Sequence, residues 1–271
     1  MDDQQFSQLL DYFGLSWRGY RKVRKGVKKR ISRHMSDLGC QNMAVYLIEL
    51  ATNEESRHVC EHLMTVSISR FFRDKKLWET LQSEIIPQLI EKPQEKINVW
   101  VAGCASGEEV YSLKVIWEDL RPGYLHLPDM VIMATDLNPQ YLKRAKAGAY
   151  PPSSLKELPE KFRSHYFHKQ KEKNLYSVKA ILKIGIVWKN HNFLEDSPEG
   201  QFDLIFIRNN LLTYYNDMIK ISVLRKVTDA LSDNGFLIIG SHEKLPYKTS
   251  DIFSKTSFSY VYRKRLGAQS I

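Results

Sequence analysis

A turn of small residues followed by two acids is the strongest chemical signal in this sequence. The hydrophobic residues 99–101 lead into the turn 102–107, which contains Gly103, and Glu108 and Glu109 then begin a predicted helix. Glycine lets a ligand approach the backbone closely. The two acids would repel a pyrophosphate, but they would accept hydrogen bonds from an ammonium group. The turn therefore predicts a nucleotide-like ligand that carries an amine and no phosphate.

Polar residues also follow three later predicted strands. Asp136 ends MVIMATD, Asn192 lies in NHNF, and Arg208 and Asn209 end FDLIFIRN. Ligands bind beyond the carboxyl ends of the strands in doubly wound sheets, and an acid after the second strand pairs with ribose hydroxyls. S-adenosylmethionine (SAM) has a ribose, an adenine, an α-ammonium and a sulfonium, and no phosphate. We therefore expect SAM rather than a dinucleotide, with another nucleotide as the alternative.

The elements that must position these residues change in type near Pro93. Before it the chain has the apolar periodicity of helices, and beyond it short hydrophobic strands alternate with helices. This alternation predicts a parallel, doubly wound α/β sheet. We expect an N-terminal helical domain over residues 1–76, a linker helix over 77–94, and a SAM-binding domain over 95–271 with a small β insertion at about 165–190.

Positive charge is concentrated near the N-terminus. Residues 12–36 contain nine Lys or Arg and no Asp or Glu, so they account for the whole net charge of +9. Val23, Val27 and Ile31 recur among them, which predicts an amphipathic helix over residues 18–33 with a basic outer face. This face is a solvated surface, a nucleic-acid contact or a docking site for an acidic protein. No recognised nucleic-acid motif accompanies it.

Several classes of protein are disfavoured. No apolar run approaches the roughly 20 residues that span a bilayer, and the N-terminus MDDQQFSQLL does not resemble a secretory signal. Cys40, Cys60 and Cys104 fit neither a disulfide framework nor a zinc site. We therefore expect a cytoplasmic protein with no metal centre and no direct membrane insertion.

Five motifs, in order along almost the whole chain, resemble those of the chemotaxis receptor methyltransferases, the CheR family. SISRFFRD is similar to the family's T-x-F-F-R element, and AGCASGEEVYSL to its S-T-G-E-E-P-Y-S loop. ATDLN, the path to NHNF, and FDLIFIRNNLLTYYN resemble the later three. The resemblance implies a Rossmann-like class I methyltransferase sheet with an N-terminal helical domain. It also implies methyl transfer from SAM to a receptor glutamate, which leaves a methyl ester and S-adenosylhomocysteine (SAH).

The resemblance further implies roles for the matching residues. Arg73 and Tyr214 would act in the transfer, although Thr213 takes the tyrosine position if no residue is inserted after Asn209. Which of the two glutamates faces SAM stays open. The acidic partner, chemoreceptor helices, would meet the basic helix at 18–33, and no nucleic acid would be involved. The residues that would bind the cofactor are Ser67, Ser69, Arg73, Gly103, Glu108, Glu109, Asp136, Asn192, Phe193, Arg208 and Asn209.

Transfer to a glutamate needs orientation rather than a base, because a carboxyl with a pKa of about 4.3 is already ionised at neutral pH. An arginine can bind both carboxylate oxygens, and Arg73 is the candidate. None of the eight histidines is assigned a catalytic role. The lack of an obvious His/Asp or Cys/His pair agrees with this reaction, and equally with a protein that binds SAM without turnover.

Departures from the family keep other interpretations open. Val110 replaces the proline of G-E-E-P-Y-S, and Ile207 replaces the cysteine of C-R-N. The alternatives are a SAM-dependent methyltransferase for another carboxylate or hydroxyl, and a non-catalytic module that binds SAM or SAH. Structural roles compete as well, with Asp136 as a helix cap, Glu108 and Glu109 opposite a helix dipole, and Arg208 in an ion pair.

Overall fold

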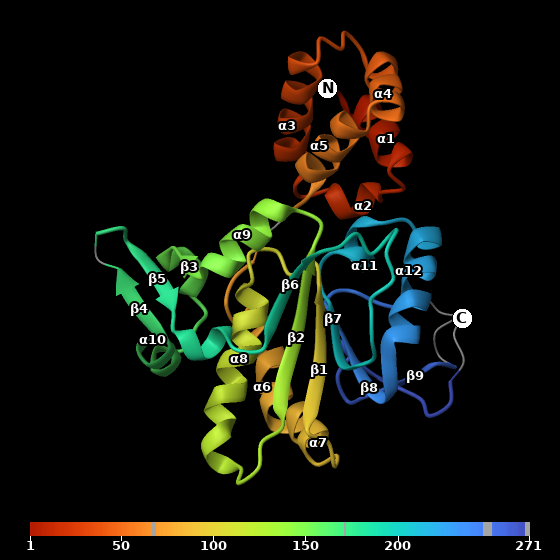
Figure 1. Ribbon diagram of the computed structural model, residues 1–271. Helices are drawn as coiled ribbons and strands as arrows, with labels where there is room; N and C mark the ends of the chain where they lie inside the picture. The colour runs from red at the N-terminus through yellow and green to blue at the C-terminus, as the bar shows by residue number, and fades with distance from the viewer. Residues whose placement is uncertain (67–68, 171, 246–250, 269–271) are drawn as a thin grey trace. The chain divides into compact units, whose positions relative to one another are not determined.

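The computed structural model describes residues 1–66, 69–170, 172–245 and 251–268, which form two compact units (Figure 1). The first unit comprises Met1–Ser67 and Asn209–Ser222, and the second comprises Ile68–Arg208 and Val223–Ile271. The segment 209–222 therefore leaves the second unit and returns to it. The predicted boundaries at residues 76 and 94 do not include this excursion, and they stay a prediction.

Helices make up the first unit, and their apolar faces meet in one core. Phe6, Leu9, Ile31, Tyr46 and Leu50 are buried in it. Side-chain caps start several of these helices, as the capping box of Asp2 does. The helices are α1 (Asp3–Tyr12), α2 (Trp17–Tyr20), α3 (Arg24–Asp37), α4 (Met43–Thr52), α5 (Glu54–Met64), α11 (Leu211–Tyr214) and the start of α12 (Asp217–Ala230).

The basic region forms two helices, so the single helix predicted over residues 18–33 is wrong. α2 ends at Tyr20 and α3 begins at Arg24, with a turn between them in which Val23 N donates to Tyr20 O at 3.0 Å. Tyr20, before the turn, and Val27, after it, are both buried in the helical core. The basic side chains that stay exposed are Arg18, Arg21, Lys22, Lys25, Lys29, Arg30 and Arg33.

A seven-stranded sheet lies at the centre of the second unit, in the order β6-β2-β1-β7-β8-β10-β9 (Figure 1). β1 (Lys96–Ala102), β2 (Asp129–Asp136), β6 (Ile186–Asn190), β7 (Phe202–Ile207) and β8 (Leu231–Ile239) are parallel, so their carboxyl ends share one edge. β10 (Val261–Lys264) is antiparallel to β8 and to β9 (Phe253–Lys255). This mixed sheet is typical of class I methyltransferases and confirms the predicted fold class.

The wholly parallel sheet expected from the alternation is wrong at its last two strands. β9 ends at Lys255 and β10 begins at Val261, and so short a connection joins antiparallel neighbours, whereas parallel strands need a crossover of a dozen or more residues. The five parallel strands at the other side are joined through helices or longer segments. The predicted site residues Asp136, Asn192 and Arg208 lie at or just beyond the carboxyl ends of these parallel strands, whereas Ser69 and Arg73 precede β1.

The helices of the second unit include a long segment before β1. It consists of α6 (Lys75–Thr80), the π-helical turn η1 (Leu81–Ile85) and α7 (Ile86–Ile90), and the register changes just before Pro87, which has no amide N–H. None of the helices in the described ranges has the length and apolar character of a membrane span. The other helices are α8 (Glu108–Leu120), α9 (Pro139–Ala147), α10 (Glu160–Tyr166), η2 (Arg121–Gly123), η3 (Pro152–Leu155) and η4 (Ala180–Lys183).

A small antiparallel sheet lies at one side of the second unit and confirms the predicted β insertion (Figure 1). Its strands are β3 (Ala149–Tyr150), β4 (Phe167–Gln170) and β5 (Leu175–Val178), with β5 in the middle. The strands therefore start earlier than the predicted range of about 165–190. Residues 186–190 of that range form β6 of the main sheet.

Candidate active site

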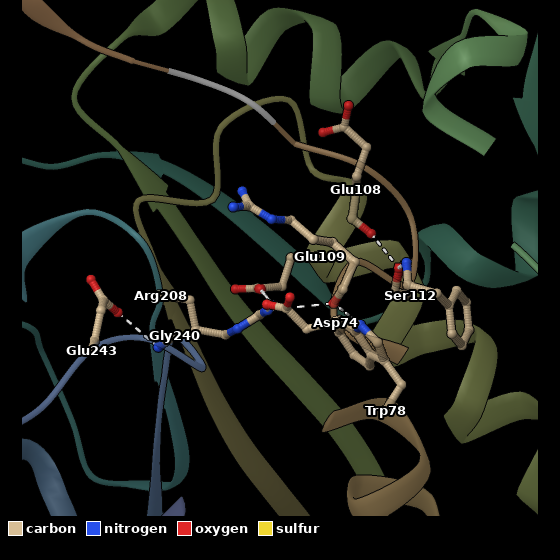
Figure 2. Close-up of polar contacts among 10 residues, drawn as sticks. Asp74, Trp78, Glu108, Glu109, Ser112, Arg208, Gly240 and Glu243 are labelled. Carbon is tan, nitrogen blue, oxygen red and sulfur yellow. Dashed lines mark hydrogen bonds and ion pairs between the residues drawn. The ribbon is translucent and has the colours of Figure 1, made fainter. Parts of the chain in front are cut away.

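Arg208, just beyond the carboxyl end of β7, joins two acidic side chains of the second unit. Its Nη1 donates to Glu109 Oε2 in the first turn of α8, and its Nη2 donates to Asp74 Oδ2 at 2.6 Å. Figure 2 shows the three side chains pointing toward one another. The Arg208 side chain is 3% exposed, so its charge depends on these carboxylates for compensation. The structure therefore confirms that Arg208 forms an ion pair, and one of its partners, Glu109, is itself a predicted site residue.

Trp78 and Arg208 together hold the backbone that carries Arg73. Trp78 Nε1 donates to the Arg73 carbonyl at 2.8 Å, and Arg208 Nη2 approaches the same oxygen at 3.4 Å. The Arg208 guanidinium also lies 5.9 Å from the centre of the Trp78 ring. Sequence reasoning missed Asp74 and Trp78, although Asp74 directly follows Arg73 and an adjacent opposite charge was a visible signal.

The backbone around Arg73 adopts an uncommon conformation. Phe72 and Asp74, on its two sides, have positive φ angles of 55° and 64°. Phe72 N donates to Ser112 Oγ at 3.0 Å, which ties this loop to α8. Backbone strain of this kind persists only where the surrounding structure imposes it, and it clusters at functional sites. The loop therefore fixes where the Arg73 side chain leaves the backbone.

The two glutamates after the glycine turn have different surroundings. The Glu109 carboxylate meets Arg208, whereas the Glu108 carboxylate points away from that cluster (Figure 2) and accepts a hydrogen bond from Ser154 Oγ at 3.5 Å. Burial raises the pKa of both carboxyls, and Arg208 opposes the rise at Glu109. Glu109 is therefore the acid that shares a site with Arg208.

Asp136 holds the glycine turn at the end of β2. Its Oδ2 accepts from Ala105 N at 2.8 Å, and its Oδ1 accepts from Asn138 N at 2.8 Å. Gly107, at the end of the turn, has a φ of +88°, and a Cβ there would lie 2.9 Å from the Trp188 ring. An ionised carboxylate has about four acceptor positions, so these two bonds do not exclude the predicted ribose contact. That contact stays a prediction.

Asn192 begins a turn that follows β6, next to the end of β2. Its Oδ1 accepts from Leu194 N at 3.1 Å, and its own N–H donates to Asp196 Oδ2 at 3.0 Å. Asn192 and Phe193 are both half-buried. Because β6 and β2 are parallel neighbours, the turn lies at the same sheet edge as Asp136. This is the position that the predicted contact with adenosine requires.

The remaining predicted site residues are not gathered in one place. Ser67 lies outside the described residues. Ser69 is half-buried and hydrogen-bonds to Glu108, and Gly103 has a φ of 72° in the glycine turn. Asn209 and Tyr214 pack in the helical unit, although they follow Arg208 along the chain. The structure therefore groups Arg73, Glu109, Asp136, Asn192 and Arg208 on the second unit, and it gives Tyr214 to the first.

The second unit has the chemistry that the amino-acid part of SAM requires. Arg208 Nε is buried and has no hydrogen-bond partner among the described residues. An acid and a guanidinium side by side complement an ammonium and a carboxylate on one ligand. In the described ranges no group of three or more His, Cys, Asp and Glu side chains is arranged to hold a metal ion.

His191, between β6 and Asn192, provides a test of the packing at this edge. Its ring nitrogens are buried without a hydrogen-bond partner in the described part of the chain, and burial lowers its pKa below the usual value. The His191 imidazole therefore binds a proton more readily in the unfolded chain than in the folded chain. Its contribution to the free energy of unfolding is fully present above pH ~6.5 and is lost as the pH falls toward the lower folded pKa.

We expect the His191→Leu variant to lose less stability than the wild type as the pH falls from about 6.5 to 5. The slopes of the free energy of unfolding against pH should differ between the two proteins by at most ~1.4 kcal/mol per pH unit, the value for one proton. Urea unfolding at several pH values measures it. Replacement of the exposed His126 in the same way is the control. Parallel curves for wild type and His191→Leu would contradict the prediction.

Comparison with known proteins agrees with this geometry. The profile of one family, described as "CheR methyltransferase, SAM binding domain", matches residues 67–262. A "Chemotaxis protein methyltransferase" of Listeria innocua is 37% identical over 68% of this chain and 67% of its own length. A "Probable chemotaxis protein methyltransferase" of Rhizobium etli is 27% identical over 90% of this chain and 94% of its own.

Solved structures are more distant in sequence. The N-methyltransferase NodS from Bradyrhizobium japonicum, in complex with SAH, covers 72% of this chain and 69% of its own at 17% identity, with a TM-score of 0.35. The fold assignment therefore rests on the strand order above. Together, the family profile and the Listeria relative show that this chain belongs to the CheR methyltransferase family, SAM-dependent enzymes that methylate glutamates of chemoreceptors.

Proposed function

We propose that this enzyme transfers the methyl group of SAM to a glutamate of a chemoreceptor cytoplasmic region, and that Arg73 and Tyr214 act on the reacting groups. The observation that carries the proposal is the Arg73 loop, whose backbone is hydrogen-bonded beside the Glu109–Arg208–Asp74 cluster. The acceptor carboxylate is ionised at neutral pH and needs no base. Orientation of well-placed reactants lowers a barrier by roughly 7–11 kcal/mol. An acceptor of this kind implies that the reaction occurs in the cytoplasm.

The cofactor would lie along the carboxyl edge of the parallel strands. Bound SAM supplies an electrophilic methyl group on its sulfonium. We assign its ammonium to Glu109 and its carboxylate to Arg208, because these opposite charges meet there while Glu108 points elsewhere (Figure 2). We assign the ribose to Asp136. The other residues proposed to line the cofactor are Ser67, Ser69, Gly103, Asn192, Phe193 and Asn209.

The acceptor would dock on the basic face of α2 and α3. Asp3 pairs with Lys28 at 2.8 Å and with Arg24 at 3.7 Å, which neutralises the side of α3 that faces α1. Lys25 and Lys29 are exposed and have no ion-pair partner among the described residues. They line a surface hollow of about 310 Å³. Unpaired surface charge of this kind attracts an acidic partner and accelerates its association.

The decisive experiment incubates the enzyme with methyl-labelled SAM and purified cytoplasmic fragments of chemoreceptors. We expect label in the receptor that mild base releases as methanol, as from a methyl ester. Label that resists base would mean methylation of nitrogen or of another group that forms no ester, and it would overturn the proposal. Titration calorimetry with SAM and SAH is the first step, since the absence of heat with both would remove the proposed site.

The role of the basic face is tested with the charge-reversal variant Lys25→Glu/Lys29→Glu. We expect a higher KM for the receptor fragment, an unchanged kcat, and a difference that shrinks as salt screens the charges. The matched control is Lys76→Glu/Lys96→Glu, which reverses two exposed lysines of the second unit. If the basic-face variant keeps its KM for the receptor fragment, the receptor does not dock on this face, and the docking role proposed for α2 and α3 is overturned.

A further inference from the structure

The segment that contains Tyr214 is built into the helical unit by backbone contacts. Ser16 N donates to Tyr214 O at 2.7 Å, and Asn216 N donates to Gly14 O at 2.9 Å. Leu15 and Tyr215 form an antiparallel bridge between these two hydrogen bonds. The chain leaves the sheet unit at Arg208, so six residues later it is already held by the loop that joins α1 to α2. The helical unit therefore determines the position of the Tyr214 backbone.

Gly19 of α2 also packs closely against this segment. A Cβ built at Gly19 would lie 2.3 Å from Thr213 O and 3.0 Å from the Cα of Tyr214. Backbone atoms cannot turn aside as a flexible side chain does, so any side chain at position 19 must displace the 213–214 backbone. Gly19 has no positive φ angle, so alanine there introduces no strain of its own. The effect of such a substitution would be confined to the displaced neighbour.

Tyr20 fixes the side chain of Tyr214. The two rings meet edge to face with their centres 5.1 Å apart, a favourable aromatic geometry. Tyr20 is buried, and its hydroxyl donates to Met64 O at 3.0 Å, so its ring cannot shift without losing that bond. Gly19 thus sets the backbone of Tyr214, and Tyr20 sets its ring.

We propose that Gly19 and Tyr20 are positioning residues for Tyr214, which they hold by its backbone and by its ring within the helical unit. The inference rests on the proposed function of Tyr214 in the transfer. The basic helix α3 begins four residues after Tyr20, so docking and positioning belong to one short stretch of sequence.

The test is a double-mutant cycle of Gly19→Ala and Tyr214→Phe, measured as kcat, KM for the receptor fragment, and SAM affinity by calorimetry. A misplacement of about 1 Å costs on the order of 100-fold in rate, so we expect Gly19→Ala to lower kcat by 10- to 100-fold with KM and SAM affinity nearly unchanged. In the Tyr214→Phe background it should have little further effect, because groups that act as a unit are not additive. The matched control is Gly26→Ala, since a Cβ at Gly26 meets only an Arg30 side-chain atom at 4.0 Å.

Each failure has a separate signature. If Tyr214→Phe alone keeps its kcat, the proposed role of Tyr214 fails, and the positioning role fails with it. If Tyr214→Phe loses activity but Gly19→Ala keeps it, or if the two losses multiply, only the positioning role is overturned. Should Gly19→Ala not fold, Tyr20→Leu must show the same split between kcat and KM, and Tyr20→Phe, which keeps the ring, must restore most of kcat.

Discussion

Replacement of Arg73 with alanine should lower kcat for receptor methylation by about 100- to 1,000-fold, the usual cost of one preorganised group that acts on the reacting charge. The guanidinium is the group that would align both oxygens of the acceptor glutamate. The fold should survive, because Trp78 and Arg208 bind the Arg73 carbonyl and not its side chain. SAM affinity, measured by calorimetry, should fall far less than kcat, because Arg73 is only one of the residues expected to bind the cofactor.

Two companion variants make this result specific. Arg73→Lys keeps the charge but loses the planar fork, so it should recover only a small part of the rate. Arg70→Ala removes another arginine of the same loop, which pairs at the surface with Glu157 at 3.4 Å, and should leave kcat unchanged. A wild-type kcat in Arg73→Ala would exclude this residue from the transfer. An equal loss in Arg70→Ala would point to a general disturbance of the loop.

The fold was predictable from the sequence wherever the pattern was local and strong. The hydrophobic runs of β1, β2 and β7 are continuous because both faces of the sheet are covered, and each run predicted its strand. β9 was not predicted, since Phe253–Lys255 is too short for any periodicity. The break between α2 and α3 was missed for a different reason. The break belongs to the tertiary packing of the helical core, in which Tyr20 is buried, and hydrophobic periodicity does not encode tertiary packing.

The sequence predicted which site residues lie at the ends of strands, but it did not predict the contacts between them. Asp136 and Arg208 follow strands whose order a methyltransferase sheet fixes, so their proximity to one edge followed from topology. The pairing of Arg208 with Asp74 joins residues 134 positions apart through a loop with positive φ angles, which no local pattern reveals. The packing of 209–222 with the helices is likewise a long-range contact, and only the structure shows that Tyr214 belongs to the helical unit.

Loss of Arg208 should strongly reduce stability. Its side chain and that of Glu109 are 3% and 17% exposed, so Arg208→Met leaves the Glu109 carboxylate buried without its cation, close to Asp74. Removal of one partner of a buried pair costs about 3–5 kcal/mol. We expect a loss of this size in the free energy of unfolding, measured with urea on the full chain, together with weaker SAM binding. Arg163→Met, which breaks an exposed pair with Glu160, should cost about 1 kcal/mol or less.

The pH dependence and a second substitution test whether the buried Glu109 carboxylate causes the loss of stability in Arg208→Met. Burial already raises the pKa of Glu109, and loss of Arg208 removes the group that most strongly opposes this rise, leaving only the weaker influence of Arg73. A carboxyl whose folded pKa lies above its unfolded value binds its proton more tightly when folded, so the deficit of Arg208→Met should narrow as the pH falls from 8 toward 5. Arg208→Met/Glu109→Gln should recover part of the lost stability at neutral pH without restoring SAM binding. A deficit that is independent of pH and unchanged by Glu109→Gln would mean that Arg208 contributes through packing on Trp78 rather than through its charge.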